Sequence, residues 1–120
     1  MELCLFAGAN IVRLGVAALT LAWTHSVEKT QWEEDWRLTA QGLVIAESRI
    51  QGTGAGMEPP AHARFDGKWY RWQPKLPPLS EVILRRSGEA GDWRVCREGK
   101  CVAMGELVAE ADPVRLRRCD

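Results

Sequence analysis

The segment around His25 carries the side chains best suited to chemistry. Ser26 and Glu28 follow His25 closely, and Trp32 and Glu34 come next along the chain. An imidazole that titrates near neutral pH, close to carboxylates, can bind an anion, sense pH or act as a general base. On a strand His25 and Ser26 point to opposite faces, so these two residues are not a nucleophile–base pair.

A second candidate is the glycine-rich segment 52–60. Its backbone amides can form a nest for a carboxylate. Its glycine spacing matches neither a dinucleotide-binding loop nor a P-loop, and it runs into Pro59-Pro60 instead of a helix. The alternative is a tight loop in which glycine supplies positive φ angles. With the first segment it completes the predicted ligand- or partner-binding set: His25, Ser26, Glu28, Trp32, Glu34, Gly54, Gly56 and Met57.

The four cysteines are candidates for two disulfides. Cys96 and Cys101 bracket a predicted two-residue turn, which would place them directly opposite each other in a hairpin. Cys4 and Cys119 can pair if the first and last strands are neighbours. Four cysteines allow three pairings, and the sequence leaves these open beside a fully reduced cytosolic protein. The close pair is unlike the ligand spacing of zinc sites, and we predict neither a metal nor a cofactor.

Strand-like alternation must position these candidates. Residues 19–28 place Leu, Leu, Trp, His and Val on one face and small or polar residues on the other. Residues 36–40 alternate too, and residues 43–50 are rich in Leu, Val and Ile. Further strands are predicted at 3–7, 11–16, 68–72, 82–86, 93–97 and 100–104, with a possible helical turn within 104–111.

This pattern predicts an all-β fold: a single small antiparallel barrel or sandwich of about eight short strands over residues 1–120. Among these shapes the size favours a meander-type barrel or half-barrel. The six tryptophans follow the same pattern. Trp23, Trp36 and Trp93 are predicted core anchors, Trp69 and Trp72 are predicted to lie on opposite faces, and Trp32 is predicted to lie in a turn as the most exposed of the six.

Charge and hydropathy exclude several classes of function. Sixteen basic and sixteen acidic residues give zero net charge, which argues against a nucleic-acid partner. Asn10 and Arg13 interrupt the apolar run near the N-terminus, so we predict no transmembrane segment. The chain begins with an acidic Glu2 and shows no readable signal peptide, so as written it reads as cytoplasmic.

Three segments together resemble a known family. Residues 23–36, residues 52–60 and the Trp69-Tyr70-Arg71-Trp72 run are similar to small uncharacterised bacterial proteins catalogued as domain of unknown function 1850. The resemblance implies an accessory role near TRAP-type transporters of the class with a TAXI binding protein, since the family's genes often lie beside theirs. It also implies that several members carry an N-terminal export or membrane segment.

We therefore expect a non-enzymatic β accessory or binding protein, with TRAP transporter subunits or a small organic anion as partners. Cysteine placement and the resemblance favour a periplasmic or membrane-associated location over the cytoplasmic one. One alternative is a small hydrolase or lyase with His25 as general base. Another is a purely structural subunit whose Trp-rich surface is buried on assembly. The sequence indicates no oligomeric state.

Overall fold

Nearly all of the regular structure is antiparallel strand. The computed structural model describes residues 1–24, 30–51, 59–86, 92–108 and 110–120. The strands of this described part are β1 (Leu3–Ala7), β2 (Asn10–Arg13), β3 (Ala18–Thr24), β4 (Gln31–Thr39), β5 (Gly42–Gln51), β6 (Arg64–Phe65), β7 (Trp69–Trp72), β8 (Glu81–Leu84), β9 (Arg94–Arg97), β10 (Lys100–Ala103) and β11 (Val114–Arg118). A short 3-10 helix, η1 (Met104–Glu106), follows β10, in the segment where a helical turn was predicted.

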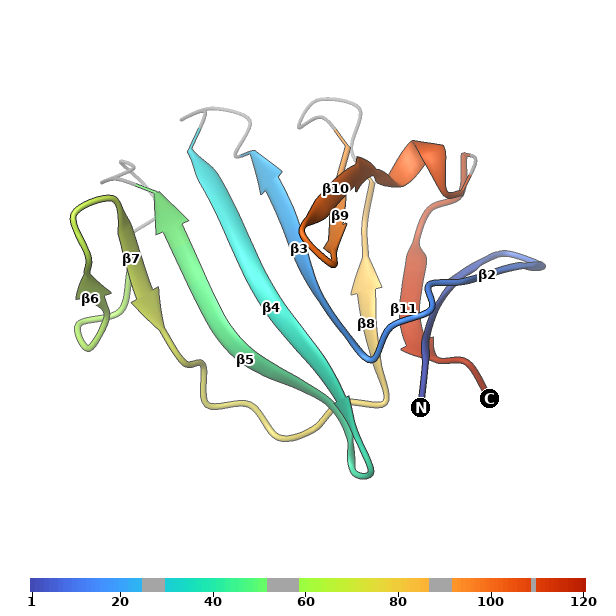
Figure 1. Ribbon diagram of the computed structural model, residues 1–120, viewed down its shortest axis with the longest axis horizontal. Coiled ribbons are helices and arrows are strands. Elements are labelled where there is room, and N and C mark those ends of the chain that lie inside the picture. Colours follow the sequence, from blue (N-terminus) through green and yellow to red (C-terminus); the bar gives the residue numbers. More distant parts are fainter. Residues whose placement is uncertain (25–29, 52–58, 87–91, 109) are drawn as a thin grey trace.

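These strands form two sheets (Figure 1). One has four strands in the order β2-β1-β11-β8, and the other has seven in the order β10-β9-β3-β4-β5-β7-β6. The all-β prediction is confirmed, and of its two shapes the sandwich fits. The sheets do not close into a barrel, because in the described residues they are hydrogen-bonded at a corner and not along whole strands. That corner is a single bridge between Leu43 and Leu79.

The corner requires a glycine. Gly42 has φ +131° and lies against the backbone of Leu79, where an added Cβ would approach the Leu79 carbonyl oxygen to 2.6 Å. A side chain at this position would therefore push apart the segment that leads into β8 and the start of β5. Backbone hydrogen bonds in both directions between Leu43 and Leu79 hold the two together, at 2.7 and 2.9 Å.

The core lies between the two sheets, where both contribute alternate residues. Leu19 and Leu21 of β3 face Leu3 and Leu5 of β1 in one cluster of buried side chains. Trp36, predicted as a core anchor, is 4% exposed and belongs to this cluster. Burial of such side chains contributes roughly 1.5–3 kcal/mol each, so alternation at period two is enough to fix which face of each strand turns inward.

The chain ends lie side by side, as the Cys4–Cys119 pairing requires. Strand β1 pairs antiparallel with β11, and the Cys119 amide donates to the Glu2 carbonyl at 3.0 Å. The disulfide between Cys4 and Cys119 spans 115 residues with its Cα atoms 4.9 Å apart. Closing a loop of that length lowers the conformational entropy of the unfolded chain, which stabilises the fold by roughly 5 kcal/mol.

The β9–β10 hairpin confirms the other predicted bridge. Cys96 pairs with Cys101 across a two-residue turn in which Glu98 and Gly99 both have positive φ, 51° and 78°. Their Cα atoms lie 4.0 Å apart in the resulting disulfide. Closing a loop this short lowers the entropy of the unfolded chain much less and stabilises the fold by only about 2 kcal/mol. The bridge therefore mainly holds the hairpin together.

Candidate binding site

Three consecutive acidic residues of β4 divide between the two faces of the seven-stranded sheet. Side chains alternate along a strand, so Glu33 and Asp35 share one face and Glu34 lies on the other. Glu34 pairs in register with Leu21, a buried core residue, and Glu33 pairs with Arg49. We call the side that Glu34 shares with the core the inner face, and the opposite side the outer face.

Four indole rings form a continuous line across the inner face, and we call this line the aromatic row: Trp93, Trp23, Trp32 and Trp72. Trp23 lies 4.6 Å from Trp93 in a tilted arrangement and 5.4 Å from Trp32 in a stacked one, measured between ring centroids. Trp32 and Trp72 are nearly perpendicular to each other, with their ring centroids 5.9 Å apart. These separations are within the range of favourable ring–ring contacts, which contribute about 0.5–1.5 kcal/mol each beyond their burial.

Strand register produces the row from residues far apart in the chain. Trp23 of β3 pairs with Trp32 of β4, which pairs with Ile50 of β5, which pairs with Tyr70 of β7. Ile50 is 0% exposed although it does not belong to the main core cluster. The aromatic rings on either side of it therefore form a second apolar cluster, at the end of the strands where β3 ends and β4 begins.

Polar groups lie within this second cluster. The Trp32 indole N–H is buried and has no hydrogen-bond partner among the described residues. Ser48, which pairs with both Glu34 and Trp72, is 2% exposed. The Glu34 carboxylate accepts a hydrogen bond from Trp36 Nε1 at 3.2 Å. Burial raises the pKa of Glu34 above its usual range, and the hydrogen bond from Trp36 opposes this only in part.

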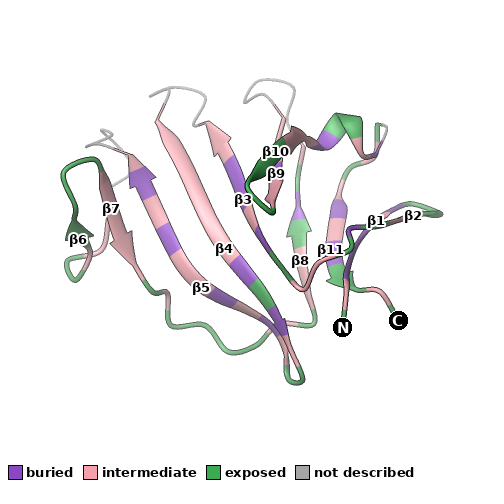
Figure 2. Ribbon diagram, in the orientation of Figure 1, coloured by how far each residue is buried: buried purple, intermediate pink, exposed green. Residues whose placement is uncertain are grey.

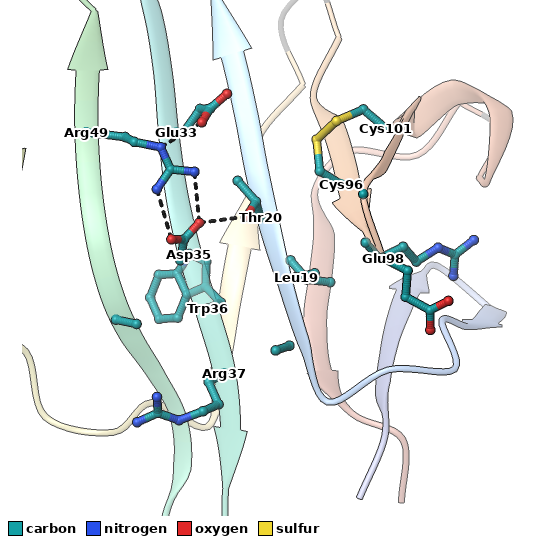
Figure 3. Close-up of a pocket in the computed structure, with 14 residues that line it drawn as sticks. Leu19, Thr20, Glu33, Asp35, Trp36, Arg37, Arg49, Cys96, Glu98 and Cys101 are labelled. Atoms are coloured by element: carbon teal, nitrogen blue, oxygen red, sulfur yellow. Dashed lines mark hydrogen bonds and ion pairs between the residues drawn. A yellow bond between two sulfur atoms is a disulfide. The ribbon is translucent and has the colours of Figure 1, made fainter. Parts of the chain in front are cut away.

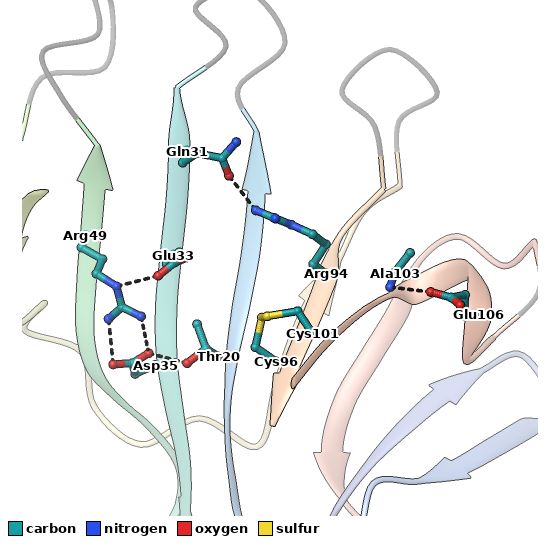
Figure 4. The surroundings of a disulfide bond; sticks show 10 residues. All are labelled: Thr20, Gln31, Glu33, Asp35, Arg49, Arg94, Cys96, Cys101, Ala103 and Glu106. Atoms are coloured by element: carbon teal, nitrogen blue, oxygen red, sulfur yellow. Dashed lines mark hydrogen bonds and ion pairs between the residues drawn. A yellow bond between two sulfur atoms is a disulfide. The ribbon is translucent and has the colours of Figure 1, made fainter. Parts of the chain in front are cut away.

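The outer face carries the opposite arrangement, an arginine held by three carboxylates, of which Figure 4 shows Glu33 and Asp35. Arg49 Nε donates to Glu33 at 2.7 Å, and its two terminal nitrogens donate to Asp35 at 2.9 and 3.1 Å. Its Nη1 also reaches Glu47 at 3.0 Å. Burial alone would raise the pKa of Asp35, but the hydrogen bonds from Arg49 and Thr20 outweigh it and hold that pKa below its usual range.

A groove of about 610 Å³ opens beside this cluster, between the sheet and the β9–β10 hairpin (Figure 3). Thr20, Asp35 and Arg49 line it from the sheet, and the Cys96–Cys101 disulfide lines it from the hairpin. On the sheet side, Thr20, Glu33, Asp35 and Arg49 are linked to one another by hydrogen bonds and ion pairs. These contacts join β3, β4 and β5 and so stabilise the sheet.

The structure reaches two of the eight predicted binding residues. Trp32 and Glu34 lie two positions apart on the inner face of β4, in and beside the aromatic row. The other six lie outside the described residues, so their prediction remains a prediction: His25, Ser26, Glu28, Gly54, Gly56 and Met57.

The predicted setting of Trp32 is wrong. Strand β4 begins at Gln31, five residues before the predicted start, so Trp32 is a strand residue and not a turn residue. It is half-buried and packs against two other indoles. The charged run Glu33-Glu34-Asp35 obscured the strand, because two of its three carboxylates are neutralised by Arg49 from the neighbouring strand.

Several residues of the site carry no local signal that points to it. Trp23 was predicted as a core anchor, yet it belongs to the aromatic row and not to the main core cluster. Trp69 and Trp72 do lie on opposite faces as predicted, Trp69 near Arg49 and Trp72 against Trp32. Only the pairing register, which no single segment specifies, shows that Trp72 faces Trp32.

Further observations bear on compartment and metal binding. Both disulfides are formed, and no cysteine is free. That state is compatible with an oxidising location outside the cytoplasm. Across the described ranges, no helix has the length and apolar character that crossing a membrane requires. Within the same ranges, no group of three or more His, Cys, Asp or Glu side chains is placed to hold a metal ion.

Comparison with known proteins identifies a family. The family described as a domain of unknown function (DUF1850) matches residues 19–104, which include β3 to β10 and all four indoles of the aromatic row. No curated protein and no solved structure matches the chain.

Proposed function

The chain belongs to the family described as domain of unknown function DUF1850, and we propose that it is a non-enzymatic, single-domain binding protein whose ligand lies on the aromatic row. One observation carries the proposal. The molecule has a second apolar cluster, built from four indoles and lying beside the main core, and it contains a buried N–H that nothing in the described structure accepts. Buried donors without partners are rare and often mark sites that a ligand completes.

The row differs from ordinary core packing in its exposure. Three of its indoles, Trp23, Trp32 and Trp72, lie outside the main core cluster and are only half-buried. Figure 2 shows the same gradient along β4, where the first half is of intermediate burial and fully buried residues appear only farther along. Half-buried tryptophans supply large, rigid apolar surface, which is what binding sites use for affinity.

The chain connects the row to the predicted residues that fall outside the described ranges. Strand β3 ends at Thr24, one residue before His25, and β5 ends at Gln51, one residue before the glycine-rich segment. We propose that His25, Glu28 and the Gly54–Met57 stretch belong to the same site. Chain connectivity supports this, because both segments continue directly from strands that carry the row or flank it.

A screen of small organic acids, amines and sugars by thermal shift tests the row. We expect a ligand that raises the melting temperature of the wild type and of Trp69→Leu but not of Trp72→Leu. Trp69 is the matched control, because it is in the same strand on the outer face, where it lies 5.9 Å from the Arg49 guanidinium. A ligand that binds all three proteins equally, or no ligand at all, contradicts the proposal.

We further propose that the protein works beside a TRAP-type transport system, outside the cytoplasm or at the membrane. The family's gene neighbourhood supports the association, and two formed disulfides support the compartment. Co-purification from native membranes should retain transporter subunits with the wild type. Absence of those subunits after crosslinking as well would refute the association while leaving the row as a ligand site.

A further inference from the structure

We infer that the aromatic row binds an organic cation, with an ammonium group over the indole faces and the Glu34 carboxylate as its counter-ion. The inference rests on the proposed function and names the chemistry of its ligand. It joins two observations on the inner face: a line of ring contacts from Trp23 to Trp72, and one acidic side chain beside that line.

The rings provide the attraction for positive charge. The face of an aromatic ring is negative and attracts a cation within about 6 Å, and tryptophan does so best. Trp32 is central, because it stacks on Trp23 and lies nearly perpendicular to Trp72. A small ammonium group at this point would contact more than one indole at once. Each such contact is worth about 0.5–2 kcal/mol, more where water is excluded.

Among the described residues, Glu34 has no cationic partner of the kind that its two neighbours have. Glu33 and Asp35 each bond Arg49, at 2.7 and 2.9 Å. No basic side chain of the described residues forms an ion pair with Glu34, whose one hydrogen bond comes from the neutral Trp36 indole. A partly buried carboxylate without a partner is costly, and a bound cation would supply the missing charge.

The surrounding strands offer no substitute. On the inner face, the described parts of β3, β5, β6 and β7 present apolar or neutral side chains, and their single titratable group is the Tyr70 phenol. On β9 the inner-facing Arg97 donates to the Leu14 carbonyl at 2.6 Å, two residues beyond the position level with Glu34. Arg86, after β8, bonds Asp92. Among the described residues, therefore, no side chain supplies a positive charge to Glu34, and we propose that the bound group brings it.

We assign this charge to a small molecule and not to a protein side chain. The polar groups at hand match a compact ligand with two functions. Glu34 would take a cation, and the unpartnered Trp32 N–H would donate to an acceptor once the ring shifts to admit it. An organic acid that carries an amino group has both functions.

Choline and its neutral isostere 3,3-dimethylbutan-1-ol separate charge from shape. We expect choline to change the tryptophan fluorescence of the folded protein and to bind roughly tenfold more tightly than the isostere, the factor that about 1.4 kcal/mol represents. Calorimetry on the same pair measures the two affinities directly. Choline binding should weaken as the pH is lowered, because protonation removes the Glu34 charge.

Two matched variants locate the effect. Glu34→Gln should lose most of the preference for choline, whereas Glu33→Gln, one residue away on the outer face, should keep it. A cooperative melt for each variant shows that the fold is intact. If choline and its isostere bind equally and Trp72→Leu binds neither, the inference of a cationic ligand is overturned. The proposal that the aromatic row binds a ligand is then still supported. No binding of either probe, or a preference unaffected by Glu34→Gln, would also overturn the inference.

Discussion

Glu34 and Asp35 are neighbours in the chain, yet they lie in opposite electrostatic environments. Asp35 turns to the outer face, where Arg49 and Thr20 donate to it and its pKa is lowered. Glu34 turns to the inner face, where burial dominates and its pKa is raised. Adjacent residues on a strand point to opposite faces, so one carboxylate gains stabilising hydrogen bonds and the next is buried at a cost in stability.

The difference agrees with the proposal that the outer face stabilises the sheet and the inner face binds a ligand. The outer network satisfies its own charges, as a stabilising surface should, and links β4, β5 and β7 through Arg49 and Arg71. On the inner face, the described residues offer Glu34 no counter-ion and the Trp32 indole N–H no acceptor. Features that cost stability persist where function requires them, and groups with perturbed pKa values concentrate at such sites.

Among variants of the two faces, removal of Arg49 should cause the largest change in the free energy of unfolding. Arg49→Met leaves Glu33, Asp35 and Glu47 together without their shared cation, so we expect a loss of about 3 kcal/mol in the free energy of unfolding. Urea denaturation measures it. Arg64→Met, an exposed arginine on the same face, is the control and should change stability by less than about 0.5 kcal/mol. Equal effects of the two variants would mean that the network does not hold the sheet.

Asp35→Asn should have an intermediate effect with a defined pH dependence. An acid whose pKa is lowered by folding stabilises the protein above its unfolded pKa, and that contribution disappears as the pH falls through the folded value. We expect a loss of about 1.5 kcal/mol at pH 7, since hydrogen bonds to charged groups are weakened, and convergence with the wild type in strong acid. A difference that is constant with pH would exclude this origin.

Glu34→Gln should give the smallest change, of opposite sign. An acid whose pKa is raised by folding destabilises the protein as the pH rises above its unfolded value, because the folded state holds the proton longer. The amide should therefore raise the free energy of unfolding by about 1 kcal/mol at pH 7, and the gain should vanish at pH 4 and below. Thermal melts across this range test it, and a loss of stability at pH 7 would show that Glu34 is paired.

Local patterns explain how much of the fold was predictable. Alternation of Leu and polar residues identified β3, and the Glu98-Gly99 turn fixed the β9–β10 hairpin with its disulfide. Both signals are contained within about ten residues. The start of β4 was missed because its carboxylates look like a solvated turn, and the arginine that neutralises them comes from another strand. The open corner of the sandwich likewise depends on Gly42 meeting Leu79, a contact that only the folded chain creates.

The site was predictable to a smaller extent. Trp32 and Glu34 were identified because an indole among carboxylates is unusual, and the structure places both beside the row. Their partners Trp23 and Trp72 come from strands separated by tens of residues and meet Trp32 through pairing register alone. Six tryptophans spread along the sequence do not by themselves say which of them share a face across the sheet.

The bridge between Cys4 and Cys119 has a mechanical consequence. Because β1 and β11 are adjacent and antiparallel, the two sulfurs join the chain where it enters the sandwich and where it leaves it. Tension applied across these two positions would be carried by the covalent bond and would not reach the strands between them. Reduction would transfer that load to the hydrogen bonds between β1 and β11, and the sheet would open from this seam first.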